Sequence, residues 1–269
     1  MATIHAGALG DLPEVHAGDD LARLIVTALD GAAQTPGPLH DGQIVAIAHK
    51  AVSKAEGAVV DLSAVIPGER ARELAQEQGK DARAVQVVLD QSAEILRAAN
   101  GVLICRTHHG FVCANAGVDA SNASTDTDTN TNTDTNTNAE TLIVLPRDPD
   151  ASARALRARL LELTGASVAV LITDSFGRAW RHGQCDVAIG LAGMQPLDDW
   201  RGRTDARGLE LRATWLAVAD AAAATADLAR AKDSREPVVL IDGLERFVTP
   251  EDGPGAVALL RPLEEDLFR

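Results

Sequence analysis

An apolar run at residues 168–172 constrains the fold of this chain more than any other segment. Its residues, Val168-Ala169-Val170-Leu171-Ile172, are followed directly by Thr173-Asp174-Ser175-Phe176-Gly177-Arg178. A run of this length and composition is typical of a buried strand, and Gly177 allows the chain to turn. We therefore expect a strand that ends at Thr173 and presents the Asp174 carboxylate beside an arginine. An ordinary turn or helix cap is the alternative, because Thr and Asp before a glycine also favour those structures.

Composition limits both the core and the ligands. The chain has 269 residues, of which 46% are hydrophobic and 24% charged, as in ordinary soluble globular proteins. Only 3% are aromatic and none is Tyr, so we expect an aliphatic core and few platforms for stacking single-stranded nucleic acid. The net charge of −14 repels phosphate backbones. We therefore expect no nucleic-acid partner, and an anionic ligand needs a local basic pocket or a bound metal.

Cysteine usage and the absence of long apolar stretches predict the compartment. Cys105, Cys113 and Cys185 are too few and too scattered for a disulfide framework or a Cys-x-x-Cys metal site. Residues 1–10 lack a basic region followed by an apolar stretch, and no segment approaches 18 uninterrupted apolar residues. We expect a cytoplasmic protein that neither enters nor crosses a membrane.

The order of the expected elements indicates the fold class. We expect helices over residues 17–30, 150–164 and 210–231, two helices within 68–98 broken near Gly79, and a short helix over 255–267. Further strands are expected over 43–48, 187–191 and 237–241, with a hairpin over 102–106 and 111–114. This mixture lacks a regular βαβ period and favours an α+β fold, a mixed β-sheet with flanking helices. No repeat or linker is visible, so residues 1–269 are interpreted as one folded unit.

A low-complexity segment interrupts this pattern. Residues 125–138 alternate Thr with Asp or Asn and contain no apolar residue. Such a segment cannot bury anything, so we expect a disordered insertion over about 123–139 whose deletion leaves folding intact. A calcium loop is disfavoured because the glycine and the terminal bidentate glutamate of an EF-hand are missing.

Two carboxylates, Asp119 and Asp174, each follow an apolar strand in a turn of small residues. If the two strands are neighbours, the carboxylates converge on Mg²⁺ or Mn²⁺, which one or two carboxylates and substrate phosphates commonly hold. Ser175 and Asn122 would add neutral oxygen ligands. Spacing in the sequence leaves this convergence open.

Basic residues gather around Asp174 in an otherwise acidic chain. They are Arg178, Arg181 and His182, with Arg201 and Arg203 beyond the next strand. Such groups neutralise phosphate or carboxylate. For Arg201 and Arg203 the alternative is a set of surface salt bridges to Asp198, Asp199 and Asp205. No second histidine is spaced to complete a metal site with His182, which favours a structural role for it.

Lys50 and Lys54 follow the expected strand at 43–48. They are four residues apart, so on a helix they share one face. They form either a phosphate clamp or a solvated helix start. The sequence contains neither a P-loop nor a Gly-x-Gly-x-x-Gly motif after a strand, which disfavours the common nucleotide sites.

Five motifs in order resemble the coenzyme F420-0:γ-glutamyl ligase family. They are Gly10-Asp11-Leu12-Pro13, Asp41-Gly42 with Val52-Ser53-Lys54-Ala55-Glu56-Gly57, Asn115-Ala116-Gly117-Val118-Asp119-Ala120-Ser121-Asn122, Thr173-Asp174-Ser175-Phe176-Gly177-Arg178 and Asp199-Trp200-Arg201-Gly202-Arg203. The resemblance implies the family's α+β fold and a homodimer that uses GTP and two divalent cations, Mg²⁺ or Mn²⁺, and it also admits K⁺. The implied reaction adds L-glutamate to a deazaflavin, F420-0, that carries phospholactate. Residues 261–268 look like the point where actinobacterial two-domain relatives continue into a nitroreductase-like domain, which suggests a single-domain actinobacterial-like form.

The resemblance also assigns site residues. It implies a GTP site lined by Leu12, Pro13, Glu14, Val15, His49, Lys50, Lys54 and Asn122. It further implies that Asp119 and Asp174 hold the first metal and Ser175 the second. Archaeal members have Thr at the position of Ser175, a change that keeps the hydroxyl. A larger departure lies at Ala231-Lys232-Asp233, where they have a glycine-rich segment with a metal-binding Glu. Whether Asp233 substitutes for that ligand, or Lys232 contacts phosphate, is open.

The implied chemistry suits these residues. Transfer of the γ-phosphoryl group of GTP to the substrate carboxylate gives an acyl phosphate, which the glutamate amine attacks. Such transfer demands positioning and charge neutralisation more than a protein nucleophile. We expect Arg178 or Arg181 to bind acyl-phosphate or substrate carboxylate oxygens. Two other hypotheses are a ligase for a different carboxylate and a nucleotide-binding module that has lost its activity.

Overall fold

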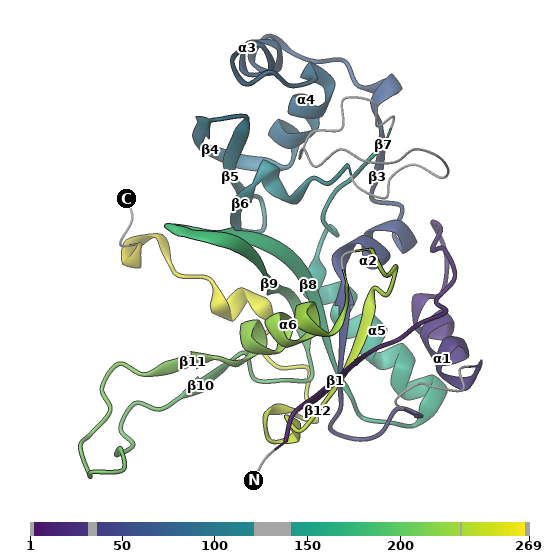
Figure 1. The fold of residues 1–269 in the computed structure, drawn as a ribbon, viewed down its shortest axis with the longest axis vertical. Coiled ribbons are helices and arrows are strands. Elements are labelled where there is room, and N and C mark those ends of the chain that lie inside the picture. The colour runs from purple at the N-terminus through teal and green to yellow at the C-terminus, as the bar shows by residue number, and fades with distance from the viewer. Residues whose placement is uncertain (1–2, 32–36, 121–140, 232, 267–269) are drawn as a thin grey trace.

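The computed structural model describes residues 3–31, 37–120, 141–231 and 233–266 (Figure 1). The expected insertion at 123–139 lies outside these residues, as do Asn122 and Lys232.

A five-stranded mixed sheet forms the centre of the molecule. Its strands, in spatial order, are β1 (His5–Ala8), β12 (Val238–Asp242), β2 (Ile44–Ala48), β8 (Ala169–Arg178) and β9 (Arg181–Ala192). Strands β2 and β8 are parallel, and the other neighbouring pairs are antiparallel. The expected α+β fold with a mixed sheet is confirmed.

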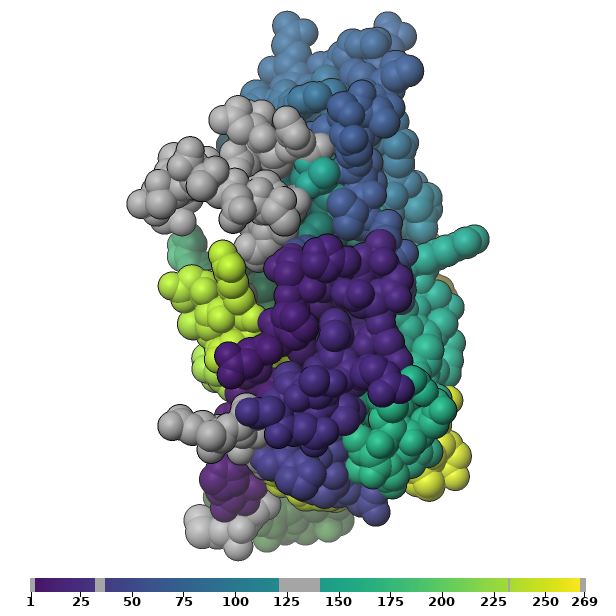
Figure 2. All heavy atoms as spheres, turned by 90° about the vertical axis from the view of Figure 1, so that its right-hand side faces the viewer, coloured from purple at the N-terminus to yellow at the C-terminus, as the bar shows by residue number. Residues whose placement is uncertain are grey.

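Helices cover both faces of this sheet because its strands alternate two apolar sets. Val45, Ile47 and Val170 pack in one cluster with α1 (Leu21–Gly31), α2 (His49–Ala55) and α5 (Pro149–Thr164). The intervening residues Ala46 and Leu171 pack instead with α6 (Val218–Ala229). This alternation is the period of two that a sheet buried on both faces requires. Figure 2 shows the N-terminal residues beside α5 on one side of the molecule.

A smaller antiparallel sheet lies above the main one in Figure 1. It consists of β4 (Ser92–Ala99), β5 (Val102–Thr107) and β6 (Val112–Ala114), covered by α3 (Glu69–Gln78) and α4 (Ala82–Asp90). The hairpin expected at 102–114 is confirmed, but the expectation of helix up to residue 98 is wrong. Helix α4 ends at Asp90, and Asn100-Gly101 turns β4 back onto β5 with φ of 52° and 76°, as a type I′ turn requires.

Short elements complete the chain. Two-stranded ribbons join β3 (Val59–Asp61) to β7 (Thr141–Ile143) and β10 (Leu197–Asp199) to β11 (Trp215–Ala217). The 3₁₀ turns are η1 (Leu62–Ala64), η2 (Asn115–Gly117), η3 (Glu245–Phe247), η4 (Ala256–Leu259) and η5 (Leu263–Glu265). None of the helices in the described ranges is long and apolar enough to cross a membrane.

Two expected boundaries near these elements are wrong. The alanine-rich helix begins at Val218 rather than near residue 210, because residues 215–217 pair with 197–199. The C-terminal segment forms the separate turns η4 and η5 instead of one helix, with Pro262 between them. Proline lacks an N–H donor and interrupts a helix at that point.

Strand β8 does not end at Thr173. A register shift between Ile172 and Thr173 marks a bulge, after which β8 continues to Arg178 and turns through residues 179–180 into β9. The motif at 173–178 is therefore the second half of a long strand, and the expected strand at 187–191 belongs to β9. Ile172 pairs with Gly190 and Thr173 with Ala188, so the extra residue of the bulge is Ile189 on β9, and β8 stays paired with β9 on both sides of it.

Candidate functional site

Asp174 lies in β8 just past the register shift, with only 14% of its side chain exposed. Burial, together with the charges of Asp119 and Asp186, raises the pKa of its carboxyl to about 7. The backbone N–H of Ser175 donates to Asp174 Oδ1 at 2.8 Å, and this bond and the Lys50 charge act in the opposite direction. A buried carboxylate with nearby negative charge gains from a bound cation.

His49 faces Asp174 from the first position of α2. The parallel pairing of β2 with β8 places Ala48 opposite Thr173, so the next residue of each strand meets at the same edge. The imidazole is 2% exposed, and its Nε2 lies 3.4 Å from Asp174 Oδ1 without a hydrogen-bond partner. Burial lowers the pKa of His49 to about 4, so the ring is neutral near pH 7. A buried nitrogen that has no hydrogen-bond partner is an exception in proteins, and beside a carboxylate it is suited to contact a ligand.

Asp119, which follows the turn η2, also lies near Asp174 and His49. Gly117 takes a φ of 70°, and Ala116 takes a left-handed φ of 54° although it is buried. This strained turn leads into a bridge in which Asp119 and Ile143 exchange two backbone hydrogen bonds of 2.9 Å. Strain of this kind persists only where surrounding structure enforces it. The Asp119 Oδ2 atom then lies 2.6 Å from Lys50 Nζ, and its charge acts on both Asp174 and His49.

Asp186 is a further buried carboxylate that the sequence analysis missed. It lies opposite Ser175 on β9 and is 1% exposed. Ser175 Oγ donates to its Oδ1 at 2.6 Å, Thr173 Oγ1 donates to its Oδ2 at 2.9 Å, and Arg230 forms an ion pair with it. Its signal in the sequence is an acidic residue inside the apolar stretch 185–192, where a buried charge requires a partner.

The residues implied for the nucleotide lie along two neighbouring segments. Leu12, Pro13, Glu14 and Val15 belong to the connection between β1 and α1, and Lys50 and Lys54 belong to α2. Lys54 Nζ forms an ion pair with Glu14 Oε1, which joins the two segments. The structure therefore brings the glutamate and both lysines to the same side of the sheet as His49 and Asp119.

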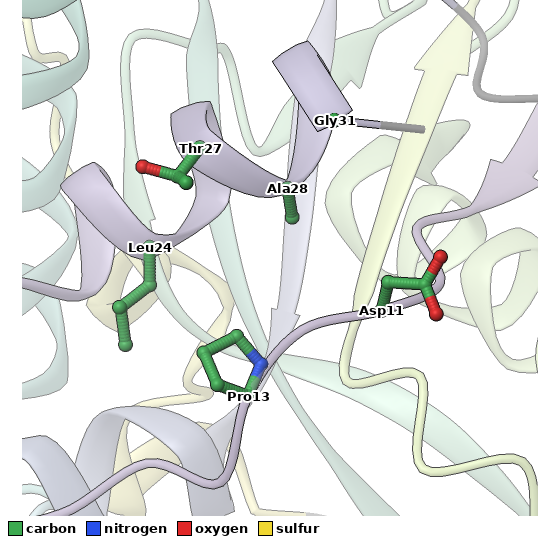
Figure 3. A pocket seen from close by; sticks show the side chains of 6 residues that line it. All are labelled: Asp11, Pro13, Leu24, Thr27, Ala28 and Gly31. Carbon is green, nitrogen blue, oxygen red and sulfur yellow. The ribbon is translucent and has the colours of Figure 1, made fainter. Parts of the chain in front are cut away.

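A small pocket beside α1 is separate from these carboxylates (Figure 3). Asp11, Pro13 and Leu24 line it with Thr27, Ala28 and Gly31, and its volume is about 180 Å³. Small-molecule pockets typically occupy roughly 300–1,000 Å³. Pro13 is its one lining residue that the sequence analysis assigned to the nucleotide.

The expected arginines do not join Asp174. Arg178 is exposed at the end of β8 and donates to the His182 carbonyl at 2.6 Å. Arg178 lies four residue steps along the extended strand from Asp174, a backbone distance of roughly 13 Å, so the expectation of an arginine beside Asp174 is wrong. Arg181 is exposed at the start of β9, across the same turn.

The β10–β11 ribbon, residues 197–217, holds the other two arginines in local pairs. Arg201 forms a two-point ion pair with Asp199 and stacks 4.0 Å from the Trp215 ring centre. Arg203 lies 3.5 Å from Asp198. For both residues the structure thus favours the salt-bridge alternative.

The oxygen donors of this site suit a hard cation. Among the described residues no group of three or more His, Cys, Asp or Glu is poised to hold a metal. Mg²⁺, however, commonly takes only one or two carboxylates and completes its shell with water and substrate phosphates. Asp119 and Asp174 provide that number, and the unpartnered His49 Nε2 lies 3.4 Å from Asp174 Oδ1. Asp233 is exposed in the connection between α6 and β12.

Comparison with known proteins yields one family. A sequence model described as F420-0:gamma-glutamyl ligase matches residues 10–243. A coenzyme F420:L-glutamate ligase of Methanothermobacter thermautotrophicus is 41% identical over 259 residues, which cover 96% of each chain. Proteins of the same name from Methanopyrus kandleri and Methanocaldococcus jannaschii are also 41% identical. The alignment with the first covers 95% of this chain and 94% of the relative, and the alignment with the second covers 86% of each. These relatives are archaeal and give no support to an actinobacterial-like form.

Proposed function

Because this chain belongs to the F420-0:γ-glutamyl ligase family, we propose that it joins L-glutamate to coenzyme F420-0 through an amide bond. The observation that carries this proposal is that the charges of the ion pair Lys50–Asp119 act on Asp174, which lies next to the orphaned His49 nitrogen. Such a cluster concentrates negative charge where a cation and an anionic co-substrate neutralise it.

The co-substrate of this proposal is GTP. Amide formation from a free carboxylate is uphill in water, so the carboxylate must first be activated. Lys50 and Lys54 supply positive charge on one helix, and residues 12–15 pack beside them. Lysine is a common point-charge partner of phosphate. Asn122 and Lys232 are additional candidate nucleotide contacts because the family resemblance and their neighbourhood in the sequence favour them.

The reaction proceeds in two balanced steps. A carboxylate oxygen of F420-0 attacks the γ-phosphorus of GTP, which forms the acyl phosphate and releases GDP. The glutamate amine then attacks the acyl carbon, and inorganic phosphate leaves with the former carboxylate oxygen as the amide forms and the amine loses its proton. Positioning and charge neutralisation provide the catalysis.

Two divalent cations, Mg²⁺ or Mn²⁺, complete the proposed site. Asp119 and Asp174 would hold the first, and Ser175 the second with Asp233 as a candidate ligand. K⁺ is a further candidate cation. When bound, these ions neutralise the transferring phosphoryl group. The donor set fits them because it consists of carboxylate and hydroxyl oxygens.

Arg178 and Arg181 have a more distant role in this proposal. Their place at the exposed turn of β8 and β9 favours contact with an anionic part of the deazaflavin substrate over contact with its reacting carboxyl. Replacing either with Ala is expected to raise the KM for F420-0 with little change in kcat. Unchanged kinetics for both variants would rule this role out.

The proposed assembly is a homodimer. The β10–β11 ribbon extends away from the body of the molecule (Figure 1). A two-stranded ribbon is marginally stable on its own in water, yet Leu209, Trp215 and Leu216 of this one are each at least 47% exposed. A second copy that packs against these side chains would supply the missing burial.

The test is a ligation assay followed by mass spectrometry. The protein is incubated with F420-0, labelled glutamate, GTP and Mg²⁺ or Mn²⁺, and one component is left out in each control. We expect F420-0 to gain one or more glutamates only in the complete mixture. With ¹⁸O in the substrate carboxylate, one ¹⁸O atom should appear in the released phosphate. A product without ¹⁸O-labelled phosphate would refute the acyl-phosphate route.

Two other outcomes identify the other hypotheses. GTP binding without product at any divalent ion would favour a nucleotide-binding module that has lost its activity. GTP hydrolysis that depends on a carboxylate other than F420-0 would favour a ligase with a different substrate.

A further inference from the structure

A buried hydrogen-bond network connects β8, β9 and the end of α6. Asp186 Oδ1 accepts from Ser175 Oγ at 2.6 Å, and its Oδ2 accepts from Thr173 Oγ1 at 2.9 Å. The Arg230 guanidinium pairs with the same carboxylate and donates from Nη2 to Thr173 Oγ1 at 2.7 Å. Asp186 is 1% exposed and the Arg230 side chain 10% exposed, so this ion pair has little access to water.

Removing one partner of such a pair is strongly destabilising, because the other charge stays buried and uncompensated. Apolar residues of similar volume, however, often replace a buried ion pair at no cost in stability. Stability alone therefore does not explain why a ligase would keep the pair beside its phosphoryl-transfer site.

The effect of this network on Ser175 is to fix the direction of its hydroxyl proton. A serine hydroxyl has one proton and two lone pairs. Because the proton is donated to Asp186, the Ser175 oxygen can interact elsewhere only through its lone pairs. An oxygen in this state is suited to ligate a cation, and a neighbouring carboxylate that fixes a ligand in this way tunes metal affinity.

Arg230 extends the network to the connection that follows α6. Besides Asp186 and Thr173, it donates from Nη1 to the Pro237 carbonyl at 3.1 Å. Residues 230 and 237 flank the segment 231–236, which contains Asp233. Arg230 thus lies at one end of this segment, binds the carbonyl at its other end, and pairs with Asp186, the carboxylate that accepts from Ser175.

We propose that Asp186 is a positioning residue for the second cation: it orients the Ser175 oxygen and, through Arg230, fixes the base of the segment that carries Asp233. This inference rests on the proposed function, because it requires a phosphoryl-transfer site with two cations. It assigns no chemical step to Asp186, which acts only through Ser175 and Arg230.

The test measures Mn²⁺ binding in the presence of GTP, without F420-0, by electron paramagnetic resonance of free Mn²⁺. We expect two bound Mn²⁺ per wild-type chain. The charge-free variant D186L/R230M and the variant S175A should each bind the weaker Mn²⁺ roughly 10–100-fold less tightly, as is usual when such a supporting group is lost. The loss in the triple variant S175A/D186L/R230M should be smaller than the sum of the two separate losses in binding free energy, since Asp186 acts in part through Ser175.

T173V is the matched control, because it removes another hydroxyl from the same carboxylate and leaves the Ser175 bond in place. It should lower the melting temperature without weakening either Mn²⁺. If D186L/R230M does not fold, D186N replaces it, since the amide keeps the shape of the side chain and can face Ser175 with its NH₂ group, which reverses the hydrogen bond.

Three results would overturn the inference. They are wild-type Mn²⁺ affinity in a folded Asp186 variant, fully additive losses in the triple variant, and a loss in T173V equal to that of D186L/R230M. Binding of a single Mn²⁺ by the wild type would also refute it. In that case a glutamylated product in the ligation assay would leave the proposed function standing.

Discussion

At the scale of single residues, the site is defined by two neighbours whose pKa values are shifted toward their neutral forms. Burial raises the pKa of Asp174 from 3.8 to about 7 and lowers that of His49 from 6.5 to about 4. Both shifts favour the uncharged group, so between these values the pair of His49 and Asp174 carries less charge than its residue types indicate. A cation would reverse the preference of Asp174.

These two shifts predict opposing effects of pH on stability without divalent metal. The raised pKa of Asp174 contributes stability that is full below pH 3.8 and is lost as the pH rises to about 7. The lowered pKa of His49 contributes stability that is full above pH 6.5 and is lost as the pH falls to about 4. We expect the two contributions largely to offset each other in the wild type.

Removing one residue should reveal the contribution of the other. Melting temperatures measured in EDTA across this pH range should rise with pH for D174N relative to the wild type, and fall with pH for H49Q relative to the wild type. Profiles parallel to the wild type in both variants would refute the assigned shifts.

At the scale of elements, the sequence predicts most strands of the main sheet, but it does not predict where β8 ends or that β4 forms. Strands β2 and β12 and helices α1 and α5 follow from their apolar patterns, and Gly165 closes α5 with a φ of 75°. The continuation of β8 beyond Thr173 depends on its pairing with β9, and the strand β4 depends on its pairing with β5. A strand that forms because of its pairing partner cannot be predicted from its own residues, since pairing overrides local propensity. For β4 the sequence does contain one signal, because Asn100-Gly101 is typical of a hairpin turn.

The turn η2 predicts a measurable effect of one methyl group. A Cβ at Gly117 would lie 2.8 Å from Leu145, whereas one at Gly79, also at positive φ, would meet nothing within 4 Å. We expect G79A to lower the free energy of unfolding by about 1–2 kcal/mol for the backbone alone. G117A should lose a further ~1–3 kcal/mol from overpacking.

G117A should in addition weaken Mn²⁺ binding, because the displaced turn carries Asp119, while G79A should not. Denaturant unfolding and Mn²⁺ titration measure the two effects. Equal stability losses and equal Mn²⁺ affinities in both variants would show that Gly117 has no special part in placing Asp119.

At the scale of the whole molecule, the sequence predicts the kind of ligand better than the position of the site. An acidic chain with few aromatics and local basic residues indicated a small anionic ligand with a metal, and the aliphatic core is confirmed with Phe111 as its one buried aromatic in the described part of the chain. The meeting of Asp119, Asp174 and His49 depends on the parallel β2–β8 pair and on a strained turn. No local pattern encodes that meeting: the residues alone left the convergence of Asp119 and Asp174 open, and the family resemblance favoured it.

The ribbon of β10 and β11 predicts the assembly. We expect light scattering after size exclusion to give the mass of two chains for the wild type. Replacing Trp215 and Leu216 with Ser should reduce it to one chain while the melting transition of the body is retained, because these side chains lie outside the main core. Leu228 is 89% exposed on α6, and L228S is the control that should leave the mass unchanged. A monomeric wild type, or an unchanged dimer in the ribbon variant, would contradict this assembly.

The role of Asp174 is tested most directly by the rate of glutamyl-F420-0 formation in D174N, measured by mass spectrometry beside the wild type and D220N. Asp220 is also a partly buried carboxyl whose pKa is raised by burial, but its oxygen accepts a hydrogen bond from the backbone N–H of Ala188. The amide oxygen of D220N can still accept that bond. We predict product from the wild type and from D220N, and a loss of at least about 100-fold in D174N, a size typical of losing one charge-stabilising group. Product formation by D174N at the wild-type rate would contradict the account.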